Sequence, residues 1–165
     1  MAGLGSFSAY LPWRRLSRRA VVDAHRWLNP GLAGNAQGTR TMAAWDEDSV
    51  TLSVEAARLA LAGADRAAID SISFASTTPP FADRQNSGIV ASALGLRNDI
   101  GSSDVAGSQR AATTAMLAAL NAAQAGTAKK TLVVAADRRK APAGGLQELQ
   151  FGDAGAALLV TADDG

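Results

Sequence analysis

Few residues of this chain could carry out covalent chemistry. It contains no cysteine, which excludes disulfides and thiolate metal sites, and its single histidine, His25, cannot form a histidine cluster. We expect His25 to have an ordinary surface or capping role. The polar residues best placed for chemistry lie in two short segments, 77–80 and 106–110, each directly after a predicted strand. In layered α/β proteins, ligands and reacting groups collect at these carboxyl ends of strands.

The elements that must position these segments follow from apolar patterning. Strands are predicted at 3–11, 69–76, 100–105, 131–136 and 154–161, and helices at 48–63, 87–94 and 108–125. Asp48 is the expected N-cap of the first of these helices, and Gly63 is its expected stop. Residues 13–45 are predicted to form a short helix plus loops. Strands that alternate with helices predict an α/β protein whose sheet is parallel for most of its width.

Composition agrees with one folded domain over residues 1–165 and restricts its partners. Hydrophobic residues make up 47% of the chain and charged residues 19%, which is typical of a folded protein. The net charge of +1 predicts no general attraction to nucleic acid or to a membrane surface. No apolar run reaches the roughly 20 residues of a membrane span, and the start lacks a signal-peptide pattern. We therefore expect a cytoplasmic protein.

Although the net charge is close to zero, basic residues are concentrated in two clusters. They comprise Arg14, Arg15, Arg18 and Arg19 near the start, and Lys129, Lys130, Arg138, Arg139 and Lys140 later. Either cluster could be a solvated face. The alternative is a rim that attracts an anionic cofactor such as coenzyme A.

Four segments together resemble one family. Residues 10–16 resemble the Y-x-P-x-x-R-[IL] opening of bacterial and archaeal hydroxymethylglutaryl-CoA synthases, and residues 46–57 resemble their D-E-D-x-x-T-[ML]-x-V-E-A-A helix start. Residues 104–113 resemble their nucleophile segment, D-[LV]-x-x-A-C-[KR]-A-G-T. Residues 151–158 resemble G-D-G-A-x-A-x-L, which type-III ketoacyl synthases share. The order and spacing agree over nearly the whole chain.

The resemblance implies the amino-terminal half of a thiolase-superfamily protein. Such a half is a βαβαβαββ unit: a mixed, mostly parallel five-stranded sheet with helices on both faces. The complementary carboxy-terminal half, which normally carries the catalytic histidine, is expected to be a separate chain or missing. The implied assembly is a homodimer of such pairs, joined at the strand 100–105, with helix 109–125 near its centre. A small zinc-ribbon and OB-fold protein that channels CoA thioesters is a further implied partner.

Members of this family are acyltransferases that form carbon–carbon bonds on CoA thioesters, and two positions here depart from their pattern. A cysteine at a helix N-terminus attacks a thioester, and a glutamate acts as general acid and base. Gln109 occupies the cysteine position and has no useful nucleophilicity, whereas Thr77 occupies the glutamate position and cannot act as a base near neutral pH. Ser108 could serve as a nucleophile only if the register slipped by one residue.

Three interpretations of Gln109 remain open. The site could be degenerate and kept for packing and assembly, it could hold a malonyl thioester during decarboxylation, or it could bind acyl-CoA without covalent chemistry. For coenzyme A itself, the resemblance indicates Arg40 and Trp27 as contacts. The alternatives are a salt bridge for Arg40 and ordinary packing for Trp27. No permanently bound cofactor or metal is expected. Gly152 and Asp153 are interpreted as structural, with the glycine permitting a tight turn before the last strand.

Overall fold

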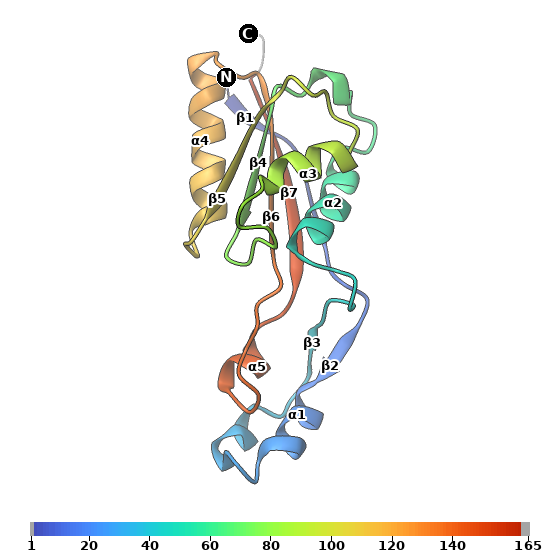
Figure 1. Ribbon diagram of the computed structural model, residues 1–165, viewed down its shortest axis with the longest axis vertical. Coiled ribbons are helices and arrows are strands. Elements are labelled where there is room, and N and C mark those ends of the chain that lie inside the picture. Colours follow the sequence, from blue (N-terminus) through green and yellow to red (C-terminus); the bar gives the residue numbers. More distant parts are fainter. Residues whose placement is uncertain (1, 163–165) are drawn as a thin grey trace.

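The centre of the molecule is a five-stranded sheet in a computed structural model that describes residues 2–162 (Figure 1). Its order is β1 (Ala2–Tyr10), β7 (Ala154–Ala162), β6 (Lys130–Asp137), β4 (Ser71–Ser76) and β5 (Gly101–Ala106). β4 pairs in parallel with β5 and β6, whereas β7 pairs antiparallel with β1 and β6. Four of the five strands therefore run in the same direction, which confirms the predicted mixed, mostly parallel sheet.

Helices cover both faces of this sheet. α2 (Ser49–Ala60) and α3 (Asn86–Ala93) lie on one face, and α4 (Ala111–Ala125) lies on the other (Figure 1). Side chains alternate along each strand, so Phe74 packs towards α2 and α3 while its neighbour Ala75 packs towards α4. The fully buried residues of α4 are all alanines, Ala111, Ala115, Ala119 and Ala123, and the partly buried Leu120 packs against the same cluster. The small alanine side chains let the helix backbone approach the sheet closely.

The start of α2 and the end of α4 follow the sequence signals, whereas α2 ends at Ala60, three residues before the predicted stop at Gly63. The Asp48 side chain accepts a hydrogen bond from the Thr51 amide at 2.8 Å, and the Thr51 hydroxyl accepts one from the Asp48 amide at 2.7 Å. This reciprocal capping box starts α2 at the predicted residue. α4 ends at Gly126, whose φ of +72° lies in the left-handed region that favours glycine.

A small second lobe lies beyond the carboxyl edge of the sheet (Figure 1). It contains α1 (Arg18–His25), a 3-10 turn (Pro30–Asn35), α5 (Leu146–Gln150) and a two-stranded ladder of β2 (Arg15–Ser17) with β3 (Thr39–Thr41). Its core is Val21, Val22, Leu32 and Leu149. The predicted short helix in residues 13–45 is confirmed. The ladder and α5 were not predicted, because three- and five-residue elements are too short to show a periodic pattern.

Candidate active-site remnant and ligand cleft

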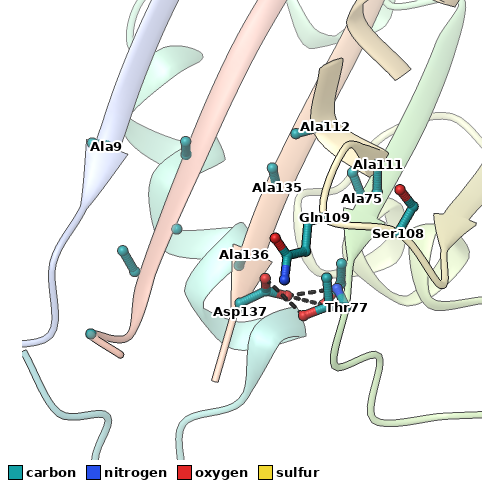
Figure 2. A pocket seen from close by; sticks show the side chains of 15 residues that line it. Ala9, Ala75, Thr77, Ser108, Gln109, Ala111, Ala112, Ala135, Ala136 and Asp137 are labelled. Carbon is teal, nitrogen blue, oxygen red and sulfur yellow. Dashed lines mark hydrogen bonds between the residues drawn. The ribbon is translucent and has the colours of Figure 1, made fainter. Parts of the chain in front are cut away.

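The two segments singled out in the sequence meet at the carboxyl edge of the sheet. Thr77 follows β4 and Gln109 precedes α4, and both line one cavity of about 350 Å³. Figure 2 shows the Gln109 carboxamide turned towards Asp137 and Thr77. Most of the remaining lining is alanine and glycine. The predicted nucleophile and base positions are thus brought together, although neither holds a residue with that chemistry.

Asp137, the last residue of β6, is the residue of this cavity that sequence reasoning missed. Its Oδ1 accepts hydrogen bonds from the Thr77 amide at 2.7 Å, the Ser76 hydroxyl at 2.9 Å and the Thr78 hydroxyl at 3.4 Å. Its Oδ2 accepts from the Thr77 hydroxyl at 2.9 Å. The available signal was its position as the first polar residue after the apolar run 132–136. Asp137 therefore fixes the loop that follows β4.

The turn before α4 holds no activated nucleophile. Gly107 has a φ of +77°, and the Ser108 hydroxyl accepts a hydrogen bond from the Arg110 amide at 3.1 Å. Among the described residues that line the cavity, Asp137 is the only ionisable one, and its two oxygens are already engaged by the four donors. The chain's one histidine, His25, lies in the other lobe at the end of α1. The cavity can hold a ligand through hydroxyl and amide groups, but it offers no base for Ser108.

A second and larger cleft, of about 850 Å³, shares Thr77 with the first cavity. Four cationic residues line it: Arg40 from β3, and Arg138, Arg139 and Lys140 from the loop after β6. The Arg40 Nε is buried without a hydrogen-bond partner among the described residues, and its Nη1 makes only a 3.3 Å bond to the Thr41 carbonyl.

The two acidic residues of this larger cleft are committed to the fold. Asp48 caps α2, and Asp153 is buried with its Oδ2 accepting from the Ala43 amide at 2.8 Å. The salt bridges of the described residues include none from the four cations. Positive charge therefore dominates the cleft, which suits a phosphate-bearing ligand.

Trp27 does not join this group. Its side chain is 78% exposed, its indole N–H donates to the Ala24 carbonyl at 3.0 Å, and it is absent from the lining of the cleft. Of the two predicted coenzyme A contacts, the structure places Arg40 in a cleft and Trp27 on the outside of the small lobe.

The glycines near the start of β7 are required for space. A Cβ at Gly152 would lie 2.7 Å from the Thr41 Oγ1, and a Cβ at Gly155 would lie 2.4 Å from the Leu52 carbonyl oxygen. Neither glycine has a positive φ. Close approach of neighbouring elements therefore disfavours a side chain at either position, in addition to the tight turn that was predicted at Gly152.

Two of the matched segments meet in one polar contact. The Tyr10 hydroxyl donates to the Glu47 Oε1 at 2.7 Å, while the Glu47 Oε2 accepts from the Ala44 amide at 2.6 Å. This hydrogen bond to a carboxylate, with burial and the charge of Glu47 adding to it, raises the pKa of Tyr10 to about 12. The contact ties β1 to the start of α2, next to the larger cleft.

A third matched segment supplies a helix cap. Asp104 in β5 accepts hydrogen bonds from the Asn86 and Ser87 amides at 2.7 and 2.8 Å, and so satisfies the first donors of α3. Partial burial raises the pKa of Asp104, but the hydrogen bonds from Asn86 and Ser87 outweigh it and hold the pKa below its ordinary value. The aspartate that opens the nucleophile-like segment therefore has a structural role.

Comparison with known proteins identifies the same relatives as the four segments. No family model matches the chain. Hydroxymethylglutaryl-CoA synthase of Aeropyrum pernix is 32% identical over 161 residues, which cover 96% of this chain and 45% of that protein. The synthase of Methanocella arvoryzae is 29% identical over 168 residues, covering 98% and 47%.

The fold comparison agrees. The crystal structure of a 3-oxoacyl-(acyl-carrier protein) synthase from Burkholderia xenovorans superposes with a TM-score of 0.88 at 20% identity, covering 99% of this chain and 49% of that one. The chain thus spans about half the length of the relatives it matches.

Proposed function

Because this chain is a homologue of one half of the hydroxymethylglutaryl-CoA synthases and has a thiolase-like fold, we propose that it is a non-covalent acyl-CoA-binding half. In this proposal it acts by assembly with a complementary half. The proposal rests on Gln109, which stands at the position that the resemblance assigns to the nucleophile and lines one cavity with Thr77. A carboxamide there can hydrogen-bond a thioester but cannot be acylated.

The larger cleft supports coenzyme A as the ligand. Its four cations lie beside Thr77, so a bound phosphate group in this cleft would leave the attached acyl arm directed at the cavity of Gln109. The unpaired Arg40 Nε is a buried donor that a phosphate oxygen would satisfy. No permanent cofactor is needed for this role.

An open apolar face supports the complementary half as partner. On the α4 side of the sheet, Phe7 of β1 is 76% exposed, and the neighbouring Ala9 and Ala156 are exposed as well. The outer side of α4 exposes Leu117, and the helix has no charged residue along its 15 positions. Exposed apolar surface of this kind marks an interaction site. In the assembled pair, α4 would become central.

Two further partners belong to the same proposal. β5 is an edge strand with one free side, so two pairs can join edge to edge into a dimer. A zinc-ribbon and OB-fold protein could deliver the thioester. Light scattering on the isolated chain tests whether it needs a partner. A stable 16.8 kDa monomer at micromolar concentration would contradict that need.

The central experiment separates binding from covalent chemistry. The purified chain, with and without the complementary half, is titrated with acetyl-CoA and then examined by intact-protein mass spectrometry. We expect saturable binding, a weaker affinity for Arg40→Ala, and no mass increase. An acyl adduct would refute the proposal and would instead support an active condensing enzyme.

Decarboxylation of a malonyl thioester is the second candidate. The carboxamide of Gln109 points into the cavity beside the Thr77 hydroxyl, where a thioester carbonyl could be held while the carbon–carbon bond to the carboxylate breaks (Figure 2). Carbon dioxide leaves, the electron pair forms the thioester enolate, and the enolate takes a proton from water to give acetyl-CoA. Incubation with malonyl-CoA and chromatography of the products tests this candidate. Accumulation of acetyl-CoA that is lost in Gln109→Ala would favour it.

A further inference from the structure

The loop that carries three of the cleft's cations is held at its far end by α1. His25, the last residue of α1, lies against Gly144, where an added Cβ would be only 3.3 Å from the His25 Cβ and 3.4 Å from its Cγ. The Asn29 side-chain amide donates to the Gly144 carbonyl at 3.2 Å. The Glu148 Oε2 accepts from the Gly144 amide at 2.8 Å and lies 3.9 Å from the His25 Nε2. We call these four residues the α1 clamp.

The α1 clamp accepts only a glycine at its centre. Gly144 has a φ of +70°, which other residues adopt only with strain, and the imidazole occupies the space where a side chain would project. The side chains of His25 and Glu148 are 27% and 21% exposed, so the contact is largely shielded from water. This histidine has no role in the cavity of Gln109, which lies in the other lobe.

The near end of the same loop is fixed to the sheet. The Arg138 amide donates to the Thr78 hydroxyl at 3.0 Å, and its guanidinium donates to the Glu47 carbonyl. The Arg139 guanidinium lies 3.9 Å from the centre of the Phe151 ring. Residues 138–140 therefore lie between two fixed points of the loop. One is the contact of Arg138 with Thr78, and the other is Gly144 of the α1 clamp, four residues after Lys140.

We infer that His25 is a positioning residue for anion binding: through Gly144 it holds the loop 138–145 so that its cations line the larger cleft with Arg40. This inference rests on the proposed function, because it assigns the clamp to the same ligand. A loop already fixed in its binding position loses little conformational entropy when the anion arrives. Without the imidazole, the loop would have to become ordered when the anion binds. We expect this entropy cost to weaken the affinity about three- to tenfold.

The test compares His25→Ala with Asp23→Ala, a control on the same helix that breaks only the exposed ion pairs with Arg19 and Arg26. Calorimetry with coenzyme A and with inorganic pyrophosphate should show weaker binding of both to His25→Ala and unchanged binding to the control. Gly144→Ala, which crowds the imidazole instead of removing it, should also bind more weakly. Circular dichroism melting identifies any variant that has lost its fold.

A spectroscopic readout separates positioning from a general loss of stability. Because His25 is the only histidine, its imidazole proton signals in NMR are unambiguous, and they should shift when either anion binds the wild-type chain. Pyrophosphate binding that shifts these signals without any coenzyme A binding would refute the proposed function and keep this inference. The inference would be overturned if coenzyme A binds the wild-type chain without shifting the His25 signals and binds His25→Ala as tightly as the control variant. The inference would also be overturned if neither coenzyme A nor pyrophosphate binds the chain.

Discussion

The close approach of β7 to α2 at Gly155 gives the sharpest prediction. Gly155→Ala places a Cβ 2.4 Å from the Leu52 carbonyl oxygen and 2.8 Å from its carbonyl carbon. Ordinary contacts of a Cβ lie at about 3.4–4 Å, so β7 and α2 must separate by roughly an ångström. No rotamer change can relieve this contact, because the two Leu52 atoms that the added Cβ meets both belong to the backbone.

The expected cost is about 2–4 kcal/mol in the free energy of unfolding, the upper part of the range for overpacked cores. For a domain of this size, each kcal/mol lowers the melting temperature by about 2–4 °C, so the shift should be roughly 4–16 °C. Urea denaturation followed by circular dichroism measures the free energy, and calorimetry measures the melting temperature.

Gly3→Ala is the matched control. Gly3 lies in β1, which pairs with β7, and an added Cβ there meets nothing within 4 Å. We expect its stability to stay within about 0.5 kcal/mol of the wild type. If Gly155→Ala is no less stable than Gly3→Ala, the packing of β7 on α2 described above is wrong.

Three further variants address the polar contacts. Tyr10 is the only tyrosine, so absorbance titration should give a single pKa of about 12, and Glu47→Gln should return it towards about 10. Since folding raises this pKa, the stabilisation is complete below about pH 10 and disappears as the pH rises towards about 12; a wild-type value near 10 would contradict the contact. Asp104→Asn should cost about 1 kcal/mol at pH 7, as for other lost caps. Because folding lowers the pKa of Asp104, the difference in unfolding free energy between Asp104→Asn and the wild type should vanish as the pH falls below about 4. A difference that stays constant across this pH range in urea denaturation would refute the stabilising role of the Asp104 carboxylate. Asp137→Asn should weaken acetyl-CoA binding in calorimetry, because an amide cannot accept all four hydrogen bonds, whereas equal affinity would show that the loop after β4 does not need them.

The large elements could be predicted from the sequence because their signals are local. The apolar run 131–136 is typical of a strand covered on both faces, and α4 is bounded by Gly126 at its end. Of the small lobe, the short helix was predicted, but its two three-residue strands were not, because they exist only through pairing with each other. Its core also joins Leu149 to α1 across more than a hundred residues of sequence.

The candidate site could be predicted only in part for the same reason. The positions of Thr77 and Gln109 were available from their place after strands, and the structure brings both to one cavity. Asp137 was missed because its role depends on β6 lying beside β4, which no local pattern reveals. The cationic cleft likewise needs Arg40 and the loop after β6 to come together from distant parts of the chain.

Under the proposed function, two kinds of residue in the matched segments would allow binding without covalent chemistry. The contact of Tyr10 with Glu47, the cap from Asp104 and the close approach at Gly155 each hold elements of the fold together. Changing any of them costs stability. Gln109, in contrast, is exposed at the cavity that it lines, so under the proposed function a carboxamide at the nucleophile position would cost the fold little. On this proposal the framework that presents a thioester would remain without the reacting group, which is the condition that a binding half requires.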